Sequence, residues 1–96
     1  MLTGKQRSYL KSLANPMDAI MQIGKGGITE NVLKQIDGAL EARELIKIKI
    51  LNNSSLEAKE TANEIAASVR AEFVQSMGNK FVLYRKSEEV LIKLPK

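Results

Sequence analysis

Gly24-Lys25-Gly26-Gly27 is the segment of this sequence that is best suited to bind a ligand. It follows a short apolar run, residues 18–23, which we predict to be a strand, and it precedes apolar residues that recur at helical spacing. Glycines let a backbone approach a phosphate group closely, the first N–H groups of a helix lack intrahelical partners, and Lys25 adds a cation. The pattern therefore predicts a clamp for a nucleic-acid backbone, as in KH domains, although an isolated Gly-x-x-Gly match is more often a plain strand-to-helix turn.

Two familiar nucleotide-binding loops do not fit this segment. A nucleoside-triphosphate loop needs a lysine and a Ser or Thr directly after its last glycine, whereas Ile28 and Thr29 follow Gly27; a dinucleotide fingerprint needs glycine where Thr29 stands. The sequence has no cysteine and no histidine, so it lacks disulfides, the usual zinc ligands and the usual general base. We therefore expect a protein that is not an enzyme and that uses no cofactor, metal or small-molecule substrate.

The charge distribution favours a polyanionic partner. Fifteen Lys and Arg against eleven Asp and Glu give a net charge of +4, and the excess lies at the two ends of the chain and at Lys47 and Lys49. These two lysines alternate with isoleucines, which places them on the opposite face of a predicted strand, where plain exposure to water and contact with a nucleic acid are equally consistent. The candidate backbone contacts are Gly24, Lys25, Gly26, Gly27, Lys5, Arg7, Lys11, Lys47 and Lys49.

The pattern of apolar residues predicts one domain, residues 1–96, with the order helix, strand, helix, strand, helix, strand, strand. Thr3 and Gln6 have the spacing of a capping box for the first helix, and Ser54 with Glu57 has it for the third. Gly38 interrupts the second helix, which suggests a close approach to the sheet there. We expect an α/β (α+β) sandwich in which a four-stranded mixed sheet carries its helices on one face, with strands at 18–23, 45–51, 73–77 and 80–85 and a further edge strand at 90–94.

No apolar run is long enough to span a membrane, and the N-terminal residues do not resemble a signal peptide. We therefore expect a cytoplasmic protein. The sequence leaves the oligomeric state open, and we expect a monomer.

Four segments occur in order along the chain: Leu-Thr-Gly-Lys-Gln-Arg-Ser-Tyr-Leu-Lys-Ser-Leu-Ala at 2–14, Gln-Ile-Gly-Lys-Gly-Gly-Ile-Thr at 22–29, Glu-Leu-Ile-Lys-Ile-Lys at 44–49 and Leu-Tyr-Arg at 83–85. Together they resemble the CRM domain, named for chloroplast RNA splicing and ribosome maturation, and in particular its stand-alone bacterial members. The resemblance covers the chain from about Leu2 to Arg85. The sequence keeps both outer glycines of the family's Gly-x-x-Gly loop, while Ile28 and Arg43 are mild departures from the family pattern.

The resemblance implies a fold like the C-terminal domain of translation initiation factor three. It also implies RNA binding through the Gly-x-x-Gly loop and its basic neighbours, with precursor ribosomal RNA of the large subunit as the expected partner. The alternative is a protein–protein adaptor that docks on ribosomal proteins or assembly factors. The RNA element, the role in assembly (chaperone, checkpoint or placeholder) and the role of the tail after Arg85 stay open.

Overall fold

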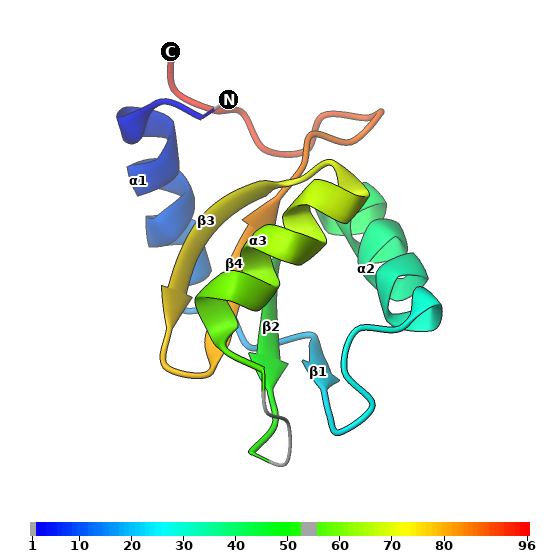
Figure 1. Cartoon of the computed structure of the whole chain (residues 1–96). Helices are drawn as coiled ribbons and strands as arrows, with labels where there is room; N and C mark the ends of the chain where they lie inside the picture. The colour runs from blue at the N-terminus through cyan, green and yellow to red at the C-terminus, as the bar shows by residue number, and fades with distance from the viewer. Residues whose placement is uncertain (1, 53–55) are drawn as a thin grey trace.

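The computed structural model describes residues 2–52 and 56–96 and has the predicted order of three helices and four strands. Figure 1 shows the strands side by side, with α3 crossing in front of them and α2 beside α3. The elements are α1 (Gly4–Ala14), β1 (Met21–Ile23), α2 (Glu30–Arg43), β2 (Leu45–Ile50), α3 (Ala58–Val69), β3 (Glu72–Met77) and β4 (Lys80–Tyr84).

The four strands form one mixed sheet in the order β1-β2-β4-β3. The β1 and β2 strands are parallel and are joined through α2, whereas β4 is antiparallel to both β2 and β3. In this register Ile23 lies beside Ile50, and Leu45 lies beside Tyr84. The carboxyl ends of β1 and β2 therefore share one end of the sheet with the β3–β4 turn, and the start of β2 and the end of β4 share the other end.

The mixed four-stranded sheet is confirmed, but the expectation that all helices cover one face of it is wrong. The α2 and α3 helices cover one face, where Ile46, Ile48, Phe81 and Leu83 point into the larger apolar cluster. The α1 helix covers the other face, which we call the reverse face. The reason is that β4 is apolar on both sides, so both of its faces must be buried. The reverse-face cluster contains Leu2, Leu10, Ala14, Leu45, Val74, Val82 and Tyr84.

The helix starts agree with the sequence in part. Thr3 and Gln6 form the predicted capping box, in which each side chain accepts a hydrogen bond from the backbone of the other residue. The predicted cap Ser54 lies outside the described residues, and α3 begins at Ala58 with Glu57 as its N-cap. Gly38 is exposed, and a Cβ added to it would meet nothing within 4 Å, so the predicted close approach to the sheet is wrong.

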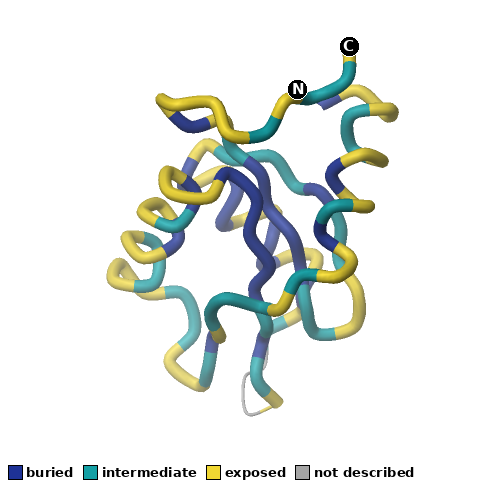
Figure 2. Tube along the Cα trace, turned by 180° about the vertical axis from the view of Figure 1, so that it is seen from behind, coloured by how far each residue is buried: buried dark blue, intermediate teal, exposed yellow. Residues whose placement is uncertain are grey.

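The tail after Arg85 forms no strand in the structure, contrary to the prediction for residues 90–94. It returns across the end of the sheet to the start of the chain, and Figures 1 and 2 both show the two termini close together. The Gln6 side chain donates a hydrogen bond of 3.0 Å to the carbonyl oxygen of Pro95, and Ile92 and Leu94 pack against the reverse-face cluster. The tail is therefore part of the domain.

Arg85, which directly follows β4, joins that strand to α2 and α3. Its guanidinium donates to the Asp37 carboxylate at 2.6 Å, to the Asp37 carbonyl at 3.0 Å and to the Val69 carbonyl at 2.8 Å. This side chain ties α2 to the end of α3. None of the helices in the described residues is long and apolar enough to cross a membrane.

Candidate nucleic-acid interface

The glycine turn, which consists of Gly24, Lys25, Gly26 and Gly27, lies directly after β1 and projects from one end of the sheet. The Gly27 N–H donates a hydrogen bond of 3.0 Å to the Gly24 carbonyl, which closes the turn. Gly27 has a φ of 70°, a left-handed conformation that favours glycine, whereas Gly26 is exposed and has open space around the position of a Cβ. Lys25 is exposed at the tip. The turn therefore offers an accessible backbone and one free-standing cation to an anionic ligand.

The glycine turn is separated from the start of α2 by two residues. Ile28 and Thr29 intervene, and Thr29 is the N-cap of α2. Its hydroxyl oxygen accepts a hydrogen bond of 3.2 Å from the Val32 N–H, so one of the unpaired donors at the helix start is already satisfied. Glu30 adds a negative charge in the first turn of α2 and lies 3.8 Å from the Lys34 ammonium. The candidate phosphate contacts are therefore the backbone and the Lys25 side chain of the glycine turn. The N-terminus of α2 offers fewer free N–H donors to a phosphate than predicted.

Lys47 was predicted to lie on the solvated face of its strand, but it is buried, with 4% of its surface exposed. The covered reverse face explains this, because the chain after α1 passes over β2. The Lys47 ammonium donates to the carbonyl oxygens of Met17 at 2.8 Å and of Asn15 at 3.4 Å. These carbonyls follow the C-terminal end of α1, where the helix dipole favours a cation. Lys47 therefore joins α1 to the sheet and is not placed to contact a ligand.

Lys49 is half-buried and lies at the same end of the sheet as the glycine turn. Its neighbour on β1 is Gln22, two residues before the turn, and its neighbour on β4 is Lys80. Lys80 was not among the residues predicted from sequence. The only signal for it is the register between β2 and β4, which the spacing of apolar residues does not fix.

The structure separates the basic residues of α1 from the glycine turn. Arg7 donates a hydrogen bond of 3.3 Å to the carbonyl of Phe73, which is near the start of β3 and thus at the opposite end of the sheet. Lys5 and Lys11 are exposed, Lys5 in the first turn of α1 and Lys11 in the last. Of the predicted contacts, the structure therefore brings together the glycine turn and Lys49, while Lys5, Arg7 and Lys11 belong to another part of the surface.

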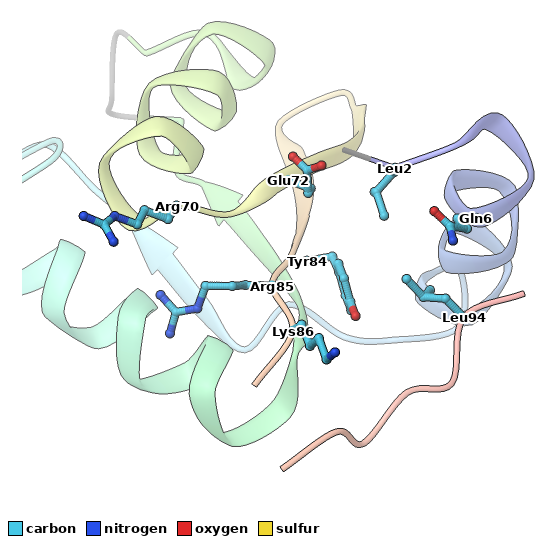
Figure 3. Close-up of a pocket in the computed structure, with 8 residues that line it drawn as sticks. All are labelled: Leu2, Gln6, Arg70, Glu72, Tyr84, Arg85, Lys86 and Leu94. Atoms are coloured by element: carbon cyan, nitrogen blue, oxygen red, sulfur yellow. The ribbon is translucent and has the colours of Figure 1, made fainter. Parts of the chain in front are cut away.

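A hollow of about 380 Å³ lies at the opposite end of the sheet, where the two ends of the chain meet. Figure 3 shows Arg70 and Arg85 on one side of it and Leu2, Gln6 and Leu94 on the other, with Tyr84 and Lys86 between them. The guanidinium of Arg85 is already occupied by Asp37 and Val69. The residues that line this hollow are Leu2, Gln6, Arg70, Glu72, Tyr84, Arg85, Lys86 and Leu94.

A buried carboxylate, Glu44, lies beside this hollow and holds the tail in place. It accepts hydrogen bonds from the N–H and hydroxyl of Ser87 and from the N–H groups of Leu91 and Ile92. Burial alone would raise the pKa of Glu44, but these hydrogen bonds outweigh it and hold the pKa below its ordinary value. Burial and the nearby Glu44 charge raise the pKa of Tyr84. Sequence reasoning missed this arrangement because a glutamate directly after a helix gives no sign of being buried.

The chemistry that these surfaces support is the binding of anions. Among residues 2–52 and 56–96, no three acidic side chains are grouped as metal ligands would be. The glycine turn, Lys25, Lys49 and Lys80 bring cations and accessible backbone to one end of the sheet.

The chain is similar to known proteins over nearly its whole length. Residues 2–85 match the family model described as the CRS1 / YhbY (CRM) domain. The chain is 46% identical over 89 residues to Probable RNA-binding protein YqeI of Bacillus subtilis (strain 168), covering 93% of each chain. It is 39% identical over 95 residues to an RNA-binding protein of Haemophilus influenzae, covering 99% of this chain and 96% of that one. The solution structure of SAV1595 from Staphylococcus aureus has 53% identity and a TM-score of 0.84, and the match covers 99% of this chain and 100% of that chain.

Proposed function

The chain belongs to the CRS1/YhbY (CRM) domain family, and from this membership we propose that it binds RNA through the phosphate backbone at the glycine turn. The observation that carries the proposal is the glycine turn, which has Lys25 exposed at its tip and open space around Gly26. The relatives that match this chain over nearly their whole length are named as RNA-binding or probable RNA-binding proteins. We propose a binding role without catalysis.

The mechanism is capture of phosphates by backbone N–H groups and lysine ammonium groups. Contacts of this kind position an RNA without reading its bases, so the protein discriminates weakly between sequences. Each phosphate that a lysine neutralises releases counterions, so affinity falls steeply as salt rises. The shape of a folded RNA then supplies the selectivity.

The RNA that we propose is precursor ribosomal RNA of the large subunit, with a role in assembly of that subunit. This step rests on the likeness of the chain to the stand-alone bacterial members of the family. A small domain with little sequence preference suits a folded precursor, which offers many phosphates in a fixed arrangement.

The test is binding of the purified chain to a fragment of large-subunit ribosomal RNA across a salt series. Gly26→Asp places a negative charge on the tip of the glycine turn, in a position where a side chain has room. Gly38→Asp is the matched control, because it makes the same change at another exposed glycine with nothing within 4 Å. Circular dichroism of all three proteins establishes that each is folded.

We expect Gly26→Asp to lose most of the binding and Gly38→Asp to bind like the wild type with the same salt dependence. Equal binding by the two variants would remove the glycine turn from the interface. Binding of a ribosomal protein or assembly factor that survives Gly26→Asp and depends little on salt would favour the adaptor function instead. Equal affinity for a transfer RNA of similar length would leave RNA binding standing and overturn the assignment to the large subunit.

A further inference from the structure

Lys49 and Lys80 face each other directly across β2 and β4 on the reverse side of the sheet. The next pair along, Ile50 and Asn79, is joined by a hydrogen bond of 2.7 Å from the Ile50 N–H to the Asn79 carbonyl. In an antiparallel ladder the pair beside a hydrogen-bonded pair is a non-hydrogen-bonded one, in which the Cα atoms are only about 4.5 Å apart and the side chains are closest. Two ammonium groups are therefore held on one small area of the surface.

This arrangement is unfavourable for the protein alone, because like charges directly opposite each other destabilise a sheet. Both lysines are half-buried, and within the described residues neither has an ion pair or a hydrogen bond from its ammonium group. Two other buried or half-buried basic side chains have partners: Lys47 donates to the carbonyls of Asn15 and Met17, and Arg7, at the opposite end of the sheet, donates to the carbonyl of Phe73. An anion between Lys49 and Lys80 would supply the missing partner.

The lysine pair is part of a row that crosses all four strands. Gln22 on β1 lies beside Lys49, and Met77 on β3 lies beside Lys80. Gln22 and Met77 are exposed. Since neighbouring strands are about 4.8 Å apart, the four side chains form a row about 15 Å long. We call this row of Gln22, Lys49, Lys80 and Met77 the strand-end row.

The strand-end row is narrow. Two residues further into β2, Lys47 is already covered by the backbone at Asn15 and Met17. In the other direction β2 ends at Ile50. A surface with one row of residues between these limits accommodates one backbone, whereas a duplex presents two.

The row also begins where the glycine turn is anchored. Only Ile23 separates Gln22 from Gly24, and the Ile23 carbonyl accepts a hydrogen bond of 2.9 Å from the Leu51 N–H, so the base of the turn is fixed to the end of β2. At the far end of the row, the Asn79 side chain donates a hydrogen bond of 3.0 Å to the Ile50 carbonyl and fixes the β3–β4 turn to β2. Both ends of the row are thus hydrogen-bonded to the end of β2.

From this continuity we propose that a single RNA strand passes from the glycine turn across the strand-end row toward the β3–β4 turn, with backbone phosphates bound between Lys49 and Lys80. The inference rests on the proposed RNA binding and adds a path, a strandedness and a second phosphate site. Gln22 donates from its amide to the same backbone, and Met77 offers an exposed apolar contact to a base.

The experiment measures binding of oligouridylates of about four to sixteen nucleotides, in the range of known single-strand site sizes, across a salt series. The test variant is Lys49→Gln/Lys80→Gln. The control is Lys86→Gln/Lys93→Gln, which removes the same charge from two exposed tail residues. Lys49→Arg/Lys80→Arg keeps both positive charges and shows whether a change of side-chain shape alone weakens RNA binding. A duplex of the same length tests the strandedness.

For a single strand, the slope of log affinity against log salt is about 0.7 for each phosphate neutralised, so loss of two contacts should make it shallower by about 1.4. We expect this change in the test variant, with affinity that stops rising at a shorter oligomer, and neither effect in the control. The test variant should unfold at the same or a higher urea concentration than the wild type, because it loses the like-charge pair, and the arginine variant should keep the wild-type slope.

The proposed path would be overturned if the test variant and the control had equal salt slopes while Gly26→Asp still abolished binding. The glycine turn would then remain the binding site. A wild-type chain that is folded and binds no oligouridylate at low salt but does bind ribosomal RNA would also overturn it. Failure to bind any RNA would overturn the proposed function itself. Tighter binding of the duplex than of the single strand would overturn the assignment of strandedness.

Discussion

The N–H and the hydroxyl of Ser87 both donate to one carboxylate oxygen of Glu44, each at 2.8 Å. Glu44 ends α2 and has a φ of 65°, and its other carboxylate oxygen accepts from the N–H groups of Leu91 and Ile92. One buried side chain thus satisfies four donors of a tail that has no secondary structure of its own.

Glu44→Ala should destabilise the protein by about 3 kcal/mol, since hydrogen bonds to a charged group are lost and buried donors are left unpaired. Urea unfolding followed by circular dichroism measures the change in the free energy of unfolding. Glu64→Ala is the control, because Glu64 lies exposed on α3. An equal, small effect in both variants would show that the tail does not depend on Glu44.

The stability of the protein should fall as the pH is lowered below the ordinary glutamate pKa of 4.5, in part because of Glu44. The pKa of Glu44 is lower in the folded protein, so the unfolded chain takes up the proton first, and stability is lost as the pH falls toward the folded pKa. Urea unfolding between pH 7 and pH 3 should show that the advantage of the wild type over Glu44→Gln shrinks with decreasing pH. A constant difference over this range would contradict the assignment.

Lys47→Met should lower the free energy of unfolding by about 1–2 kcal/mol, because the Met17 and Asn15 carbonyls lose their charged donor. It should leave the salt dependence of RNA binding unchanged, since the ammonium group is buried. Of the two neighbouring lysines on β2, Lys47 would then stabilise the fold and Lys49 would bind RNA. A shallower salt slope in folded Lys47→Met would place Lys47 at the interface after all.

Gly38→Ala should raise the free energy of unfolding by about 0.5–1 kcal/mol, because alanine loses less conformational entropy in a helix and no atom lies within 4 Å of the new Cβ. Thermal and urea unfolding measure the gain. A loss of stability would mean that the position contacts something, as the sequence suggested.

The order of elements and the α2 and α3 face of the sheet could be predicted from sequence because both follow from local periodicity. Thr3 and Gln6 define the first cap, and Ile46, Ile48 and Ile50 define one face of β2. The reverse face could not be predicted in the same way. The alternating Lys47 and Lys49 are typical of an exposed face. Only the three-dimensional arrangement shows that the chain after α1 covers Lys47 and leaves Lys49 half-buried.

The candidate site was predictable to a similar extent. The glycine turn is a local motif that can be found in the sequence, and Lys25 and Gly26 are exposed at its tip. The pairing of Lys49 with Lys80 depends on contacts between distant strands, and the capture of the tail by Glu44 depends on the fold as a whole. Residues such as Arg7 and Lys47, which are basic in the sequence, use their donors on backbone carbonyls.

The hydrogen bond between Gln6 and Pro95 spans 89 positions of the sequence, and the reverse-face cluster likewise combines Leu2 and Leu10 with Ile92 and Leu94. The cluster under α2 and α3 draws its buried residues from a shorter stretch, from Ile23 to Leu83. The apolar cluster on the reverse face therefore depends on contacts between the two ends of the chain, and local opening of either end would break them. We expect the amide hydrogens of α1 and of the tail to exchange together, and faster than those of the strands beneath α2 and α3.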